Sequence, residues 1–190
     1  MMLRGWSAGA AVGSILAVLG CSDPAAPPAT GSATVQLSAV SPPVAGKSCA
    51  AQGDPIFLGL NGVGPSGTAK GRPYTDDEDG ANVSCSVGSG SEIKFSGLIE
   101  NSGGVFFQVT GSVVKGGTGK ASVSVYDPDS TDVLTSPNDQ LCDVRVDTPP
   151  LVVGEESIWA SYSCPALTSK DNQSILCDVD LSWFYFDHCK

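Results

Sequence analysis

The sequence predicts an all-β fold, most simply a two-sheet antiparallel β-sandwich of about nine strands with three disulfides. Apolar residues beyond residue 33 repeat with a period of two rather than 3.6, which is typical of strands. The 190 residues include 23 glycines and 13 prolines, so turns are frequent. Six cysteines lie in the same region and can form three cross-links. A closed β-barrel is the alternative architecture.

Residues 1–20 have the features of a secretory signal peptide. The only charged residue, Arg4, precedes an uncharged run that ends at Gly20, and its part from Ala8 to Leu19 is small and apolar. This run is shorter than the roughly 20 apolar residues that a membrane-spanning helix requires. A charged start and a short apolar core with small residues at its end are typical of an export signal.

The end of this segment, AVLGCS at 17–22, resembles the lipobox of bacterial lipoproteins. In that family the cysteine is diacylated on sulfur and becomes the mature N-terminus, which implies lipidation of Cys21. Gly20 matches the pattern, whereas Val18 and Leu19 stand where leucine and then alanine or serine are more usual. Ser22 in place of aspartate implies sorting to the outer membrane. An ordinary signal peptide cleaved elsewhere is the alternative.

The cysteine count favours lipidation. Seven is an odd number for an exported chain. Acylation of Cys21 leaves six cysteines, the number expected of three disulfides in an oxidising compartment. These six are Cys49, Cys85, Cys142, Cys164, Cys177 and Cys189. Two or more acyl chains also anchor a protein stably, whereas one chain binds membranes only marginally.

The chain is expected to contain three parts. Residues 1–20 are the signal peptide, residues 21–32 are a lipidated tether rich in proline, alanine and serine, and residues 33–190 are a single β-domain. Such a tether is extended, at about 3 Å per residue. The expected strands of the domain cover residues 33–40, 56–60, 83–87, 92–99, 105–114, 120–126, 141–147, 156–164 and 175–187.

We expect the disulfides Cys164–Cys177, Cys49–Cys189 and Cys85–Cys142. This pairing assumes that each strand runs opposite to the one before it, which sorts the loops to two ends of the domain. Cys164 ends one strand and Cys177 begins the next, so a hairpin places them opposite each other. A continuous last strand separates Cys177 from Cys189 by roughly 40 Å, whereas a disulfide requires Cα atoms within about 7 Å.

The charge balance excludes two classes of partner. The 20 acidic residues outnumber the 10 basic ones, which gives a formal net charge of -10. Nucleic-acid binding requires clustered lysine and arginine, and so does a polybasic surface for anionic lipids. We therefore expect no nucleic-acid partner. The expected contact with a membrane is through the N-terminal lipid.

Two acidic clusters are candidate calcium ligands. The first is Asp76–Asp79, and the second contains Asp127, Asp129 and Asp132. Both are expected in long loops at one end of the domain, and calcium takes about six to eight oxygen ligands. Neither cluster has the spacing of a known calcium loop, and Pro128 interrupts the second, so solvated acidic turns are the favoured interpretation. No zinc motif is present and no cofactor is expected.

Catalytic residues are not expected. The single histidine, His188, lies beside Cys189 and is interpreted as a surface or edge residue. Paired carboxylates can hydrolyse glycosides, but any acidic chain offers such pairs. The long connection at 61–82 is typical of a binding loop. Its Tyr74, and Trp159 if it points outward, are candidate contact residues for a sugar or a partner protein.

These observations predict a lipid-anchored protein of the bacterial cell envelope, more specifically of the outer membrane, whose β-domain has a binding or structural role and no catalytic activity. An envelope protein or a carbohydrate is the candidate partner. A calcium-dependent recognition module for carbohydrate or protein is one alternative. A carboxylate-based hydrolase is the other.

Overall fold

The computed structural model describes the chain outside residues 1–24, 50–52, 60–71, 127, 129–131 and 148–150. The predicted signal peptide and Cys21 therefore lie outside the described residues. The part of the tether that is described begins at residue 25. Within the described residues, no helix is long and apolar enough to cross a membrane.

The all-β class is confirmed, because the described residues form strands and no helix. Each of the nine expected strands has a counterpart, with the first one divided into two. Three strands of two or three residues were not expected, since an alternation of period two is not visible over so few positions. The strands are β1 (Thr30–Val35), β2 (Leu37–Ala39), β3 (Ile56–Leu58), β4 (Tyr74–Thr75), β5 (Asn82–Val87), β6 (Glu92–Glu100), β7 (Phe106–Val114), β8 (Thr118–Tyr126), β9 (Val133–Thr135), β10 (Cys142–Arg145), β11 (Val152–Val153), β12 (Ile158–Ser169) and β13 (Leu176–Asp187).

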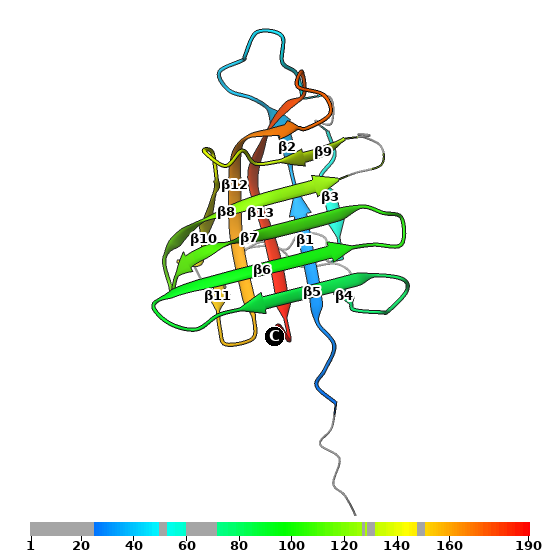
Figure 1. The fold of residues 1–190 in the computed structure, drawn as a ribbon, viewed down its shortest axis with the longest axis vertical. Coiled ribbons are helices and arrows are strands. Elements are labelled where there is room, and N and C mark those ends of the chain that lie inside the picture. The colour runs from blue at the N-terminus through cyan, green and yellow to red at the C-terminus, as the bar shows by residue number, and fades with distance from the viewer. Residues whose placement is uncertain (1–24, 50–52, 60–71, 127, 129–131, 148–150) are drawn as a thin grey trace, which may run out of the picture.

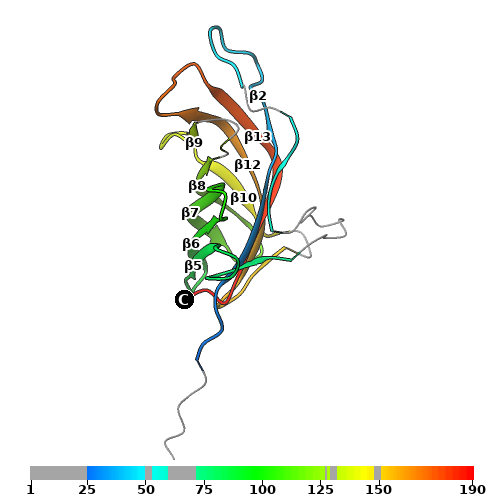
Figure 2. The same ribbon diagram turned by 90° about the vertical axis from the view of Figure 1, so that its right-hand side faces the viewer.

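The strands form one continuous hydrogen-bonded sheet that folds over on itself. The order along the sheet is β3-β1-β13-β12-β10-β8-β7-β6-β5, and neighbouring strands are antiparallel. Strands β5 to β8 run crosswise over β1, β12 and β13, so the domain has two layers (Figures 1 and 2). Strand β9 pairs with both β8 and β12, and β10 pairs with the same two strands. The four strands β8, β10, β12 and β9 therefore close a small ring. The fold thus has the layers of a sandwich and one barrel-like turn.

The core lies between the two layers and is centred on aromatic side chains. The ring centroid of Phe184 on β13 is 5.7 Å from that of Phe95 on β6 and 5.9 Å from that of Phe107 on β7. The Phe107 ring also lies 5.5 Å from the ring of Tyr162 on β12. The buried Tyr162 hydroxyl donates a hydrogen bond of 2.9 Å to the Thr34 carbonyl, and burial raises the pKa of Tyr162. Each buried ring contributes about 1.5–3 kcal/mol.

Glycines allow the two layers to approach closely. A Cβ atom on Gly97 of β6 would lie 2.3 Å from the ring of Phe186 on β13. On the facing layer, a Cβ on Gly31 of β1 would lie 3.0 Å from Ile99 and 3.0 Å from the same ring. Glycine within a strand often marks such an approach of another element. The Phe186 ring therefore fills space that two absent side chains leave open.

All six domain cysteines form disulfides, but the expected pairing is wrong. The structure contains Cys49–Cys177, Cys85–Cys189 and Cys142–Cys164, in place of Cys164–Cys177, Cys49–Cys189 and Cys85–Cys142. The separation of Cys177 from Cys189 is confirmed, because β13 is continuous between them.

The assumption of strict alternation fails between β3 and β5. Strand β3 is antiparallel to β1, and the antiparallel ladder from β1 through β13, β12, β10, β8, β7 and β6 gives β5 the same sense as β3. Every later strand is therefore reversed relative to the expectation, and β13 is antiparallel to β1. As a result, Cys49 lies near the start of β13, where Cys177 pairs with Ala39, and Cys85 lies near its end.

The expected hairpin pair fails for a local reason. Strand β12 continues past Cys164 as far as Ser169, so Cys177 lies opposite Leu167 rather than Cys164. In the antiparallel pairing of β10 and β12, Asp143 lies opposite Ser163. The adjacent Cys142 therefore lies opposite Cys164, and the two form a disulfide.

Non-reducing proteolysis followed by peptide mapping should give the linked pairs 49–177, 85–189 and 142–164. Mild acid should be used so that the disulfides do not exchange. Any linked peptide joining Cys177 to Cys189 would contradict the continuous β13, and a Cys164–Cys177 peptide would contradict the extension of β12 to Ser169.

Replacing Gly97 by alanine should destabilise the domain by about 1–3 kcal/mol, because the added methyl overlaps the Phe186 ring. The free energy of unfolding in guanidinium chloride measures this change. Gly117→Ala is the matched control, since its Cβ would make only a 3.4 Å contact with Val114. Phe186→Leu should restore part of the loss when combined with Gly97→Ala. Additive losses in the double variant would contradict the contact.

Candidate functional site

The first acidic cluster uses its carboxylates to build its own turn. Asp76 Oδ1 accepts a hydrogen bond of 2.9 Å from the Val83 main-chain nitrogen. Arg72 lies 2.7 Å from Glu78 Oε1 and 3.3 Å from Asp79 Oδ2. A hydrogen bond from the Thr75 side chain, together with the Arg72 guanidinium, lowers the pKa of Glu78. These contacts stabilise a surface turn between β4 and β5.

Two members of the second acidic cluster, Asp127 and Asp129, lie outside the described residues. The described Asp132 accepts a hydrogen bond of 3.0 Å from the Ser169 hydroxyl, which ties the start of β9 to the end of β12. In the described parts of the chain, no group of three or more histidine, cysteine or acidic side chains is arranged to hold a metal ion.

His188 follows β13 and lies beside a half-buried aromatic pair. Its main-chain nitrogen donates to Asp187 Oδ1 at 3.0 Å, while the Tyr185 hydroxyl donates to Asp187 Oδ2 at 2.9 Å. Burial, aided by the Asp187 carboxylate, raises the pKa of Tyr185 to about 12. The Trp159 ring meets the Tyr185 ring edge-on at 6.3 Å. Trp159 is therefore half-buried against a neighbouring strand rather than free at the surface.

Tyr74 is not part of an open loop. It forms the two-residue strand β4, opposite Gly31 of β1, and is half-buried against the core. Neither contact residue expected from the sequence therefore stands free on the surface.

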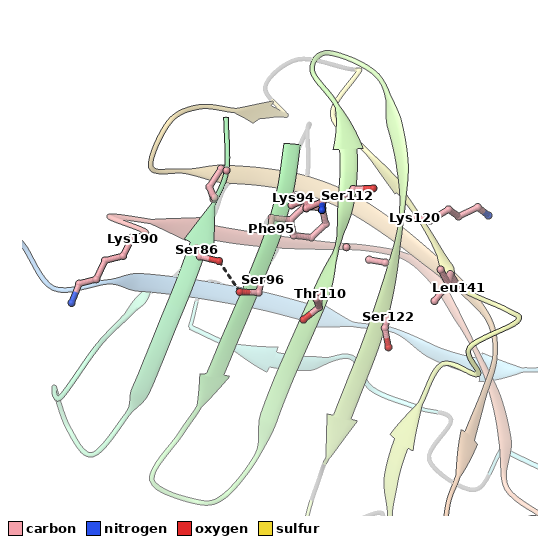
Figure 3. A pocket seen from close by; sticks show the side chains of 14 residues that line it. Ser86, Lys94, Phe95, Ser96, Thr110, Ser112, Lys120, Ser122, Leu141 and Lys190 are labelled. Carbon is pink, nitrogen blue, oxygen red and sulfur yellow. Dashed lines mark hydrogen bonds between the residues drawn. The ribbon is translucent and has the colours of Figure 1, made fainter. Parts of the chain in front are cut away.

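A broad hollow lies on the outer face of β5 to β8, away from the core. Its volume is about 670 Å³, and fourteen residues line it (Figure 3). A smaller hollow of about 270 Å³ adjoins it and shares Ser86, Ser96 and Thr110. A third hollow of about 390 Å³ shares Lys120 and Leu141 with it. Together they form a continuous depression, here called the hydroxyl groove.

A row of hydroxyl side chains crosses the centre of the hydroxyl groove. Ser86, Ser96, Thr110 and Ser122 occupy directly paired positions on the four successive strands β5 to β8 (Figure 3). Four strands place this row over about 15 Å. Ser86 Oγ and Ser96 Oγ are 2.9 Å apart and share a hydrogen bond. Among the described residues the Thr110 hydroxyl has no partner, so it is free to bind a ligand.

The row arises from the same alternation that builds the core. In β5 to β8, buried residues such as Val83 and Val123 point inward, and the intervening serines and threonines point outward. Because the four strands are consecutive antiparallel neighbours, outward positions from each strand align in rows across the sheet.

Three further rows lie beside the hydroxyl row, two on one side and one on the other. On one side, Leu98 and the exposed Gln108 pair across β6 and β7, and beyond them the rings of Phe106 and Tyr126 stack with centroids 5.9 Å apart. On the other side, Lys94, Ser112 and Lys120 lie in paired positions (Figure 3). The face therefore changes from aromatic to hydroxyl-rich to cationic.

Lys190 lies at the β5 end of the groove, and Leu141 lies at the β8 end (Figure 3). The main-chain nitrogen of Lys190 donates a hydrogen bond of 3.1 Å to the Cys85 carbonyl, and the Cys85–Cys189 disulfide holds this segment beside β5. The fourteen lining residues include no aspartate, glutamate, histidine or cysteine.

The sequence analysis did not identify this groove. The outward serines and threonines were interpreted only as the wet faces of the strands. Serine and threonine occupy fewer than half of the outward positions in these four strands, so the sequence offered no distinctive signal for the row.

Comparisons with known proteins add no assignment to this geometry. No family model matches the chain, and no curated protein or solved structure is detectably similar to it.

Proposed function

We propose that this chain is a lipid-anchored protein of the bacterial cell envelope whose β-domain binds a polysaccharide chain in the hydroxyl groove without catalysing its conversion. The observation that carries the proposal is the open depression across β5 to β8, with its row of four hydroxyls. A groove that spans the sheet suits an extended chain better than a compact small molecule.

The chemistry of the groove favours a carbohydrate over a protein partner. A hydroxyl both donates and accepts hydrogen bonds, as the hydroxyls of a sugar do. The stacked pair of Phe106 and Tyr126 lies two rows away on the same face and does not line the groove. Protein interfaces instead depend on large apolar or arginine anchors seated in pockets. The one strongly exposed apolar side chain on β5 to β8, Val114, does not line the groove.

The lining residues support binding without catalysis. Hydrolysis of a glycosidic bond generally requires two carboxyl groups on either side of it. The three hollows of the groove are lined by one acidic side chain, Asp139, and by no histidine, and their one cysteine, Cys85, is held in a disulfide, so no pair of carboxyl groups lines the groove. The hydroxyls lie on regular strands, and among the described residues no hydrogen bond joins a hydroxyl of the row to one of the lining lysines, as activation by such a base would require.

Export and anchoring are supported by the cysteines. Three disulfides join residues 128, 104 and 22 positions apart, and such bonds persist mainly in oxidising compartments. With all six domain cysteines paired, Cys21 is the one that remains for the lipid. The proline-rich tether would hold the domain, and with it the groove, away from the membrane surface.

Thr110→Val should weaken polysaccharide binding about threefold to tenfold, because it removes one free hydroxyl and preserves the shape of the side chain. A panel of soluble polysaccharides in affinity electrophoresis selects the ligand, and titration calorimetry measures its Kd. The matched control is Thr118→Val, an exposed position of β8 that does not line the groove. Failure of the wild-type domain to bind any polysaccharide would overturn the proposal, and so would equal affinities of the two variants.

Mass spectrometry of the protein extracted from its native membrane should show a chain that begins at Cys21 and carries acyl groups. Cys21→Ala should abolish acylation and leave the protein in an unanchored or unprocessed form. The Ser22→Ala variant is the control and should still be acylated. An intact 190-residue chain with free thiols in the cytosol would contradict both export and anchoring.

A further inference from the structure

We infer that the polysaccharide bound in the hydroxyl groove is an acidic one, with carboxylate groups that the groove lysines recognise. This inference rests on the proposed function and assigns its ligand class. Lys94, Lys120 and Lys190 are among the fourteen residues that line the main hollow, and no acidic side chain is among these fourteen; Asp139 is the one acidic side chain that lines an adjoining hollow. The whole chain has the opposite balance, with twice as many acidic as basic residues.

The lysines are positioned by neighbouring strands. Lys94 on β6 and Lys120 on β8 occupy the same row, separated by Ser112 on β7 (Figure 3). Two strand spacings put their Cα atoms about 10 Å apart. Lys190 lies at the β5 end of the adjacent hydroxyl row. In Figure 3, Lys94 lies beside Ser112 next to the hydroxyl row, whereas the side chains of Lys120 and Lys190 extend outward at the two ends of the hollow.

The lysines differ in their access to a ligand. Lys120 Nζ is 2.7 Å from Asp143 Oδ1, in an ion pair whose two side chains are both more than half exposed. Neither Lys94 nor Lys190 forms an ion pair with any described carboxylate. The nearest acidic side chain on the same face, Glu92, accepts a hydrogen bond of 2.8 Å from the Ser112 hydroxyl. Lys94 is thus the ammonium group most available to an incoming anion.

A carboxylate gains more from these lysines than a neutral hydroxyl does. Charge-assisted hydrogen bonds are roughly twice as strong as neutral ones. The net charge of the chain opposes an acidic ligand at long range, but salt at physiological concentration screens charges beyond about 8 Å. Charges that lie beside a bound ligand therefore matter more than the net charge of the chain. The exposed Lys120–Asp143 pair is weak enough for a ligand carboxylate to compete for Lys120.

The test compares polymers that share a backbone and differ in charge. Polygalacturonate is paired with its fully methyl-esterified form, and carboxymethyl dextran is paired with dextran. The polysaccharide selected from the panel is included as well. The full chain should bind the acidic member of a pair at least about tenfold more tightly, and added salt should reduce this preference.

Variants identify the groups responsible. Lys94→Gln should weaken binding of the acidic polymer about threefold to tenfold and leave any neutral polymer unaffected. Asp143→Asn should strengthen binding of the acidic polymer about twofold to fivefold, because it releases Lys120. Lys170→Gln is the control, since Lys170 lies at the hairpin between β12 and β13 outside the groove. Unchanged unfolding midpoints show that the variants remain folded.

The outcomes separate this inference from the proposed function. Equal binding of acidic and neutral polymers, or a preference for a neutral polymer that Thr110→Val weakens, would overturn the acidic ligand and leave polysaccharide binding intact. An acidic preference that Lys94→Gln does not reduce would also overturn the inference. Absence of binding to every polymer, including the panel, would overturn both.

Discussion

The fold depends on how closely the two halves of one sheet can approach each other. The sheet turns through β10, β8, β9 and β12, and its far half then lies across β1, β12 and β13. The Phe184 and Phe186 rings fill the space between the halves, and the absence of a side chain at Gly97 leaves room for one of them. Because both layers belong to a single sheet, this contact also determines the curvature of the outer face. The hydroxyl groove therefore depends on the packing of the core.

The disulfides secure the parts of the fold that the strand ladder holds least. Cys142–Cys164 joins directly opposed positions of β10 and β12. The other two bonds tie a loop and the C-terminal segment to the sheet across 128 and 104 residues. In the chain-entropy description, the loops closed by these bonds correspond to roughly 3 kcal/mol for the short one and 5 kcal/mol for each long one. The Cys85–Cys189 disulfide also holds Lys190 beside β5, so this structural bond helps to shape the proposed binding surface.

Much of the fold was predictable because burial imposes a period of two on each strand. The nine expected strands, the continuous last strand and the six bonded cysteines follow from local patterns. The disulfide pairing did not follow, because it depends on strand direction across the whole sheet. Strands β3 and β5 have the same sense in the ladder, whereas strict alternation made them opposite, and this difference reverses every later strand. Cys142 and Cys164 are the pair that directly opposed strands bring together, since the expected strands 141–147 and 156–164 already put both cysteines at the same end.

The site was harder to predict than the fold because its residues carry no distinctive motif. Ser96 and Thr110 are ordinary outward residues in the sequence, and only pairing across β6 and β7 aligns them. The lysines are likewise isolated in sequence, and the strand register gathers them. The acidic clusters stand out in the sequence, yet in the described residues their carboxylates stabilise turns and strand ends. Conspicuous composition and functional geometry are therefore separate properties in this chain.

The short strands at the border of the sheet affect whether separate copies of the domain can associate through their sheet edges. At one border of the sheet, β3 and β4 have only three and two residues. At the other border, the main-chain nitrogen of Lys190 donates a hydrogen bond to the Cys85 carbonyl of β5. Unpaired main-chain groups are what allow one sheet to add to another. Lipid anchoring would concentrate many copies of this domain side by side, where intermolecular strand addition is most favourable. Because these borders are short and partly covered, neighbouring copies would stay separate, and the outer face of β5 to β8 would stay accessible in each copy.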